Sequence, residues 1–122
     1  MEFFKNNKNI NAGFFVPSFF QKLEDINKLK STALSKMKHI IFGGEPIPKG
    51  LLSNIYKLIK KVKDYNVYGT TETAIISHWH LVPKTVKHKD EIPVGKELPN
   101  FKIILVNNNG KESNINESGE VY

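Results

Sequence analysis

The chain has 122 residues, of which 39% are hydrophobic and 25% are charged, so it can form one globular domain or a part of one. It contains no cysteine, which excludes disulfides, thiolate metal sites and a cysteine nucleophile. Eighteen lysines and arginines against 12 aspartates and glutamates give a formal net charge of +6.

The positive charge raises the question of a nucleic acid or another polyanion as partner. The lysines are scattered along the chain, mostly at positions typical of solvated helix faces, and they form no dedicated basic patch. We therefore expect no nucleic-acid partner. A polyanion-binding protein with strongly salt-dependent binding remains an alternative.

No apolar stretch approaches the ~20 residues that a membrane-spanning helix needs. The first residues also lack the apolar core and small-residue cleavage site of a signal peptide. We expect no membrane partner and a cytoplasmic location.

The first 42 residues predict two strands with helices between them. Residues 10–16 read as a short buried strand that Pro17 ends, and Ser18 is placed to cap a helix carrying Phe19, Phe20 and Leu23. Residues 27–37 predict a second short helix. Residues 39–42 form an apolar strand that stops at two glycines.

The clearest helical pattern covers residues 48–62, with Pro48 suited to the first turn and lysines outside the apolar stripe. Residues 64–68 predict the next strand. Two strand–helix–strand units of this length predict parallel pairing through right-handed crossovers. We therefore expect an α/β fold with a mostly parallel sheet and crossover helices.

The pattern changes after Glu72. Residues 74–79 and 102–106 predict strands, residues 83–91 a polar loop, and residues 107–110 a turn. Residues 119–122 begin another strand at the end of the chain. The sequence thus predicts an α/β part over residues 1–73 and a β-rich part over residues 74–122.

Residues 66–73 carry the most chemistry. Tyr68 offers a flat ring on which a base can stack, and Gly69 permits close approach of the backbone. Thr71 can donate a hydrogen bond to a phosphate oxygen, and Glu72 is a hard oxygen ligand suited to Mg²⁺. Asn66 has the amide donor and acceptor to read the edge of an adenine.

Residues 68–72 resemble the Tyr-Gly-x-Thr-Glu signature of the acyl-adenylate-forming, AMP-binding superfamily. Four other segments match that family in the same order: residues 16–18, 43–47, 92–100 and 118–121. The chain is most similar to amino-acid adenylation domains of nonribosomal peptide synthetases and to D-alanine–carrier-protein ligases. These usually have proline where this chain has Thr70, so an acyl-CoA synthetase-type parent stays open.

The resemblance implies ATP and Mg²⁺ as cofactors and a role for each matching residue. Thr71 and Glu72 would be catalytic, with Glu72 holding the metal. The nucleotide-binding residues would be Gly43, Gly44, Glu45, Asn66, Tyr68 and Gly69. The carboxylate-substrate pocket would be lined by Phe14, Ile41, Gly43, Val67, Ile75 and Ile76. These side chains carry no charge, so we expect a small or apolar carboxylate, such as an amino acid.

The resemblance also implies parts that this chain lacks. The family has an upstream phosphate loop, a downstream aspartate that holds the ribose, and a C-terminal domain with a lysine that contacts the reacting carboxylate. We therefore expect residues 1–122 to be an internal piece of the large N-terminal domain, inactive alone and prone to self-association. Its parent would transfer the acyl group to a carrier-protein thiol.

Simpler interpretations stand beside these. The signature could be only a turn and helix start, Gly43 and Gly44 a plain turn, and the pocket residues ordinary core. His78 and His80 could form a metal pair on one strand face, but packing or surface histidines are commoner. A non-catalytic α/β binding or scaffold module is the remaining alternative.

Overall fold

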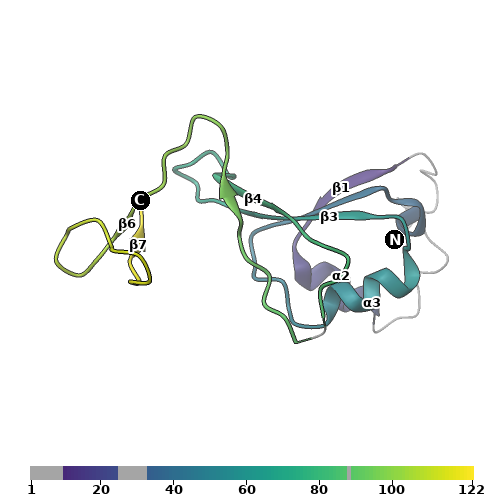
Figure 1. Ribbon diagram of the computed structural model, residues 1–122. Coiled ribbons are helices and arrows are strands. Elements are labelled where there is room, and N and C mark those ends of the chain that lie inside the picture. The colour runs from purple at the N-terminus through teal and green to yellow at the C-terminus, as the bar shows by residue number, and fades with distance from the viewer. Residues whose placement is uncertain (1–9, 25–32, 88) are drawn as a thin grey trace.

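A computed structural model describes residues 10–24, 33–87 and 89–122. Its centre is a five-stranded sheet with strand order β1-β2-β3-β4-β5 (Figure 1). The strands are β1 (Ala12–Phe15), β2 (His39–Phe42), β3 (Lys63–Tyr68), β4 (His78–Leu81) and β5 (Lys96–Glu97).

The sheet is mixed. β1 pairs with β2 and β2 with β3 in parallel, whereas β3 pairs with β4 and β4 with β5 in antiparallel. The α/β class is confirmed, but a mostly parallel sheet is not. Residues 69–77 are too few for the crossover that a further parallel strand would need, so the chain turns back instead.

The helices lie together on one face of the sheet: α2 (Pro17–Glu24), the 3-10 helix η2 (Ala33–Lys36) and α3 (Leu51–Leu58) (Figure 1). Their apolar stripes pack against alternate residues of the central strands, which gives the core. The buried core residues are Phe20, Leu23, Leu34, Met37, Ile40, Phe42, Ile47, Leu51, Leu52, Ile55, Ile59, Val62 and Val82.

The helix boundaries differ from those predicted. α2 already includes Pro17, so Ser18 lies in its first turn and is not its N-cap. α3 begins only at Leu51, because Gly50 takes a left-handed conformation with φ 86° directly before it. The helix expected at residues 27–37 falls partly outside the described residues, and its described end is η2.

The other face of the sheet carries no helix among the described residues. The strand register places Phe14, Ile41, Tyr65 and Leu81 in one row and pairs Val67 with Trp79. We call these six residues the open face. Phe14, Trp79 and Leu81 keep 48%, 42% and 46% of their surface exposed.

The last part of the chain forms a separate two-stranded sheet of β6 (Leu105–Val106) and β7 (Glu120–Val121), which lies apart from the main sheet (Figure 1). The predicted turn at residues 107–110 is present, closed by a hydrogen bond from Gly110 N to Asn107 O of 2.9 Å. The strand predicted at residues 74–79 begins only at His78, because Ala74 and Ile75 have left-handed φ angles of 52° and 83°.

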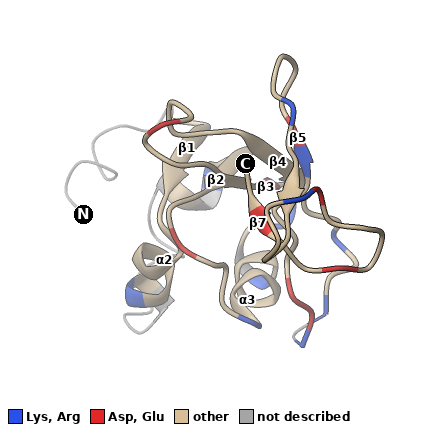
Figure 2. Cartoon of the chain, turned by 90° about the vertical axis from the view of Figure 1, so that its left-hand side faces the viewer, with Lys and Arg blue, Asp and Glu red and all other residues tan. Residues whose placement is uncertain are grey.

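The division of the chain at residue 73 stays a prediction, and the main sheet continues across it through β4 and β5. Basic and acidic residues are interspersed over several elements (Figure 2). Within the described ranges, no helix has both the length and the apolar character that crossing a bilayer requires.

Candidate functional site

The candidate site lies where the three parallel strands end. Val16 follows β1, Gly43 and Gly44 follow β2, and Gly69 follows β3, so these residues share one edge of the sheet. Ligands of open parallel sheets bind outside the carboxyl ends of the strands. Two cavities open at this edge, and Gly44, Val67 and Gly69 line both of them.

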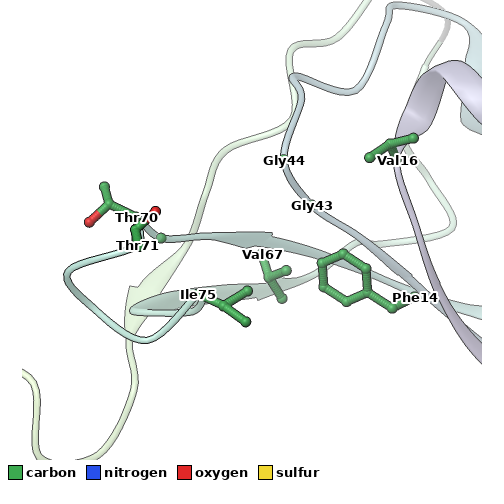
Figure 3. Close-up of a pocket in the computed structure, with 9 residues that line it drawn as sticks. Phe14, Val16, Gly43, Gly44, Val67, Thr70, Thr71 and Ile75 are labelled. Carbon is green, nitrogen blue, oxygen red and sulfur yellow. The ribbon is translucent and has the colours of Figure 1, made fainter.

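The first cavity has a volume of about 370 Å³ and uncharged walls. Phe14, Val67 and Ile75 form its apolar side, and Thr70 and Thr71 stand at its end (Figure 3). Its other lining residues are Val16, Gly43, Gly44 and Gly69.

Two glycines of this cavity are required by close packing. A Cβ on Gly43 would lie 2.7 Å from Phe14 Cζ and 2.9 Å from Val67 Cγ2, and one on Gly69 would collide with the Ile75 carbonyl. Larger residues at either position would therefore displace the cavity wall.

The second cavity has a volume of about 340 Å³. It is lined by three segments of the chain: residues 44–46, the end of β3 with Gly69 (Asn66, Val67, Tyr68 and Gly69), and Ile92 with Val94. Both volumes fall within the usual range of small-molecule sites, ~300–1,000 Å³. Sequence reasoning places residues 92–94 in a matching segment but not in the site, since no local pattern shows that this segment folds back onto β3.

Glu45 is held by the start of α2. Its Oε2 accepts a hydrogen bond of 3.0 Å from the Ser18 backbone N–H, and its Oε1 accepts one of 3.0 Å from Ser18 Oγ. A carboxylate is favoured at a helix N-terminus, where backbone N–H groups lack partners. The side chain of Glu45 therefore fixes the loop of residues 43–47 against α2.

Asn66 is 5% exposed, and its Nδ2 donates a hydrogen bond of 2.9 Å to the carbonyl of Pro93. A second, long contact of 3.5 Å reaches the carbonyl of Ile92. The amide donor that the sequence assigns to adenine is thus engaged within the protein.

Tyr68 presents its ring at the second cavity and is 40% exposed. The ring of His78 packs edge-on against it, with centroids 5.5 Å apart, and His78 Nδ1 lies 2.9 Å from Ser77 Oγ. His78 is therefore a buried packing residue. Among the described residues, no group of three His, Asp or Glu side chains is arranged to hold a metal.

Residues 70–75 form turns and begin no helix. Thr70 N donates to Thr73 Oγ1 at 2.8 Å, and Thr73 Oγ1 donates back to Thr70 O at 3.1 Å. A hydrogen bond from the Thr70 side chain, then one from its own backbone, holds the pKa of the exposed Glu72 carboxyl below its ordinary value. Glu72 is thus a carboxylate at neutral pH.

The structure brings together most of the residues expected to bind the acyl substrate or the nucleotide. Phe14, Gly43, Val67 and Ile75 line the first cavity, and Thr71 reaches it. Gly44, Glu45, Asn66, Tyr68 and Gly69 line the second. Ile41, Ile76 and Glu72 line neither cavity; Ile41 is half-buried on the open face, and Glu72 is exposed.

Two known proteins with similar sequences align with most of this chain. The chain is 26% identical over 114 residues to a D-alanine–D-alanyl carrier protein ligase of Bacillus licheniformis. It is 26% identical over 106 residues to gramicidin S synthase 2 of Aneurinibacillus migulanus. These matches cover 93% and 87% of this chain but 23% and 2% of the relatives, so the chain spans a quarter or less of their length.

Solved structures share the fold. PA1221, a nonribosomal peptide synthetase protein with adenylation and PCP domains, matches with a TM-score of 0.80 at 21% identity, over 93% of this chain and 23% of that one. The N-terminal subdomain of Klebsiella oxytoca NpsA, solved in complex with 3-hydroxybenzoyl-AMSN, gives a TM-score of 0.71 at 21% identity, over 93% and 28%.

The family model described as "AMP-binding enzyme" matches residues 4–122, which is nearly the whole chain. Three observations support one assignment: the order of the five matching segments, the two cavities at the carboxyl edge of the sheet, and the match to the family model. The chain belongs to the AMP-binding enzyme family.

Proposed function

We propose that this chain forms part of the site at which an ATP-dependent enzyme activates a carboxylate as an acyl-adenylate. The observation that carries the proposal is the pair of cavities that share Gly44, Val67 and Gly69. An acyl-adenylate has an acyl group and an adenosine joined through one phosphate. Two adjoining cavities suit such a molecule.

The second cavity takes the adenine. Tyr68 supplies the stacking surface, worth ~1–3 kcal/mol for one base. The loop of residues 44–46 supplies the facing wall, and Gly69 lets the backbone approach the ribose and phosphate.

The first cavity takes the acyl group. Phe14, Val67 and Ile75 give it an apolar wall, and no charged residue lines it. A charged substrate side chain would lose its hydration there without gaining a partner, which is costly. The preferred substrate is therefore a small or apolar carboxylate, with an amino acid favoured by the name of one relative, a D-alanine ligase.

The phosphate lies between the cavities, beside Thr70 and Thr71. Thr71 is exposed at the end of the first cavity and donates its hydroxyl to a phosphate oxygen. Donors fixed where negative charge develops lower the barrier to attack by the substrate carboxylate.

Glu72 is the residue suited to Mg²⁺. Its carboxylate is exposed, close in sequence to Thr71, and deprotonated at neutral pH because of its lowered pKa. Mg²⁺ is commonly held by one or two carboxylates together with substrate phosphates. When bound, the ion neutralises phosphate charge.

The acyl acceptor is a carrier-protein thiol. This assignment rests on the names of two relatives, a carrier protein ligase and a synthetase protein with a PCP domain. CoA is the second candidate, because Thr70 stands where the amino-acid-activating members usually have proline.

The test uses the complete open reading frame that encodes this chain. Carboxylate-dependent exchange of pyrophosphate into ATP is measured across apolar, small and charged amino acids. We expect the highest rates with apolar or small substrates. Glu72→Gln should lower exchange by ~10²-fold or more, on the scale of one lost transition-state stabiliser.

Glu112→Gln, an exposed carboxylate in the C-terminal segment, is the matched control and should leave exchange unchanged. Absence of exchange with every carboxylate would contradict the proposal and favour a non-catalytic binding module. A preference for aspartate or lysine would contradict the assignment of the first cavity.

A further inference from the structure

We propose that Glu45 is a positioning residue: its carboxylate caps helix α2 from a distant segment and so fixes residues 44–46, one of the segments that line the second cavity. The contact between Glu45 and Ser18 is here called the latch. The ligand of the cavity rests on the proposed function, whereas the latch itself rests on the contacts below.

The start of α2 lacks a cap from its own segment. The residue before the helix is Val16, whose side chain has no hydrogen-bond acceptor, and Pro17 has no backbone N–H. The Phe19 N–H donates to the carbonyl of Val16 at 3.0 Å. The Ser18 N–H is thus left for a partner from elsewhere in the chain, and Glu45 Oε2 accepts it at 3.0 Å.

Both oxygens of the Glu45 carboxylate take part in the latch. Oε1 accepts a second hydrogen bond of 3.0 Å, from Ser18 Oγ. Hydrogen bonds with one ionised partner are stronger than those between neutral groups, and the helix dipole favours a negative charge at this end of α2. Two such bonds to one residue fix both the distance and the orientation of the carboxylate.

The loop of residues 44–46 depends on the latch for its position. Before the loop, Gly43 N donates to Phe15 O at 3.2 Å, and after it Ile47 enters the core. Residues 44–46 are exposed between these anchors, and in the described part of the chain they make no loop backbone hydrogen bond. The latch therefore ties this exposed stretch to the start of α2.

The latch also connects the two cavities. Gly44, directly before Glu45, lines both of them, and Val16, two residues before Ser18, lines the first (Figure 3). A Cβ on Gly44 would lie 3.5 Å from Val16 Cγ1, so the two segments are neighbours at this point. Loss of the latch should therefore move the nucleotide cavity relative to the acyl cavity.

A direct contact between Glu45 and the nucleotide would give a different result from the latch. A carboxylate that contacts the ligand acts independently of Ser18. A carboxylate that acts through Ser18 gives single variants whose effects do not add, because each one breaks the same contact. Variants of both residues are therefore needed.

The experiment measures pyrophosphate exchange by the protein that the complete open reading frame encodes, as wild type, Glu45→Ala, Ser18→Ala and the double variant. In Glu45→Ala we expect the KM for ATP to rise about 5-fold, on the scale of one hydrogen bond, with kcat nearly unchanged. Ser18→Ala should raise KM less, because its backbone N–H remains. The double variant should match Glu45→Ala. Ser18→Thr, which keeps the hydroxyl, and Glu112→Gln, an exposed carboxylate elsewhere, should match the wild type.

A readout without nucleotide accompanies the kinetics and uses the ¹⁵N-labelled chain. Amide hydrogen exchange at Ser18 should rise in Glu45→Ala and stay at the wild-type level in Glu112→Gln. Unchanged exchange at Ser18 in Glu45→Ala would overturn the latch, whatever the kinetics give.

Additive effects in the double variant, or a higher KM in Glu45→Ala with none in Ser18→Ala, would also overturn the latch. Either result would assign direct ligand contact to Glu45 and leave the proposed function intact. A fall in kcat at unchanged KM would overturn it as well. If the wild type shows no exchange of pyrophosphate with any carboxylate, the proposed function fails. Faster amide exchange at Ser18 in Glu45→Ala would then still support the latch.

Discussion

The two faces of the main sheet are built from the same strands but have opposite environments. On β2, Ile40 and Phe42 point into the helix layer and are fully buried. Ile41 lies between them in sequence and points to the open face, where Phe14, Trp79 and Leu81 keep over 40% of their surface exposed. The side chains that alternate along β2 thus point either into the buried core or onto an uncovered apolar surface.

The comparison shows what kind of sheet the sequence encodes. Residues 39–42 are apolar on both faces of β2 apart from His39, a pattern typical of sheets covered on both sides. In the described residues only one side is covered. The site lies at the edge between these two faces, with the first cavity formed partly by Phe14 and Val67 of the open face.

The sharpest way to test the comparison is to remove a ring from each face. Phe42→Ala should destabilise the chain by ~3–5 kcal/mol, because it leaves a cavity in the core. Phe14→Ala should cost under ~1 kcal/mol, because half of its surface already contacts water. Urea unfolding measures both, and similar losses for the two variants would mean that the open face is also a core.

The second prediction concerns association through the open face. An apolar patch in this position favours contact between copies of the chain. Leu81→Lys should shift the sedimentation profile of the purified chain toward the monomer. Leu105→Lys, at a similarly exposed leucine of β6, is the control and should leave the profile unchanged. A wild-type chain that is monomeric at all accessible concentrations would refute the prediction.

A third prediction concerns a charge inside the covered region. Asp64 is fully buried, with Lys84 Nζ 3.1 Å from its Oδ2 and 3.6 Å from the ring centre of Tyr56. Burial raises the pKa of the Asp64 carboxyl above its ordinary 3.8, although Lys84 opposes the shift. The folded state therefore holds a proton on Asp64 more readily than the unfolded state does.

The sign of the pH effect follows from this shift. The stability that Asp64 contributes is fully present below about pH 3.8 and is lost as the pH rises through the raised folded value. Relative to Asp64→Asn, the wild type should lose stability between acidic and neutral pH. Thermal melts of both proteins across this range measure it, and a constant difference would contradict the raised pKa.

The smallest expected effect is the change in melting temperature when Glu72 is replaced. Glu72 is exposed, so Glu72→Gln should leave the melting temperature within about 1 °C of the wild type. A large loss of stability would assign Glu72 a structural role in place of the catalytic one.

Much of the fold could be predicted because local patterns control it. β1 and β2 follow short apolar runs that end at proline or glycine, β3 ends at Gly69, and α3 follows a helical stripe. The start of α3 differs from the prediction because the left-handed Gly50 outweighs the preference of Pro48 for a first turn. The antiparallel β4 is shifted because the turn after Tyr68 extends through Ile75.

The candidate site also has a part that the sequence predicts and a part that it does not. Residues in the recognised segments could be assigned to it, since their order along the chain carries the resemblance. The partners of Glu45 and Asn66 could not be predicted, because Ser18 and Pro93 lie 27 positions away from them and no local pattern links such distant residues.

One titration tests the central assignment most directly. AMP is added to the ¹⁵N-labelled wild-type chain while amide shifts are followed across both faces and the carboxyl edge. We predict saturable shifts, with millimolar affinity corresponding to about 4 kcal/mol, at Gly44, Glu45, Tyr68, Gly69 and Val94. The Trp79 indole and Leu81 on the open face should not shift. Saturable shifts centred on the open face or on β6 and β7, with none around the second cavity, would contradict the account.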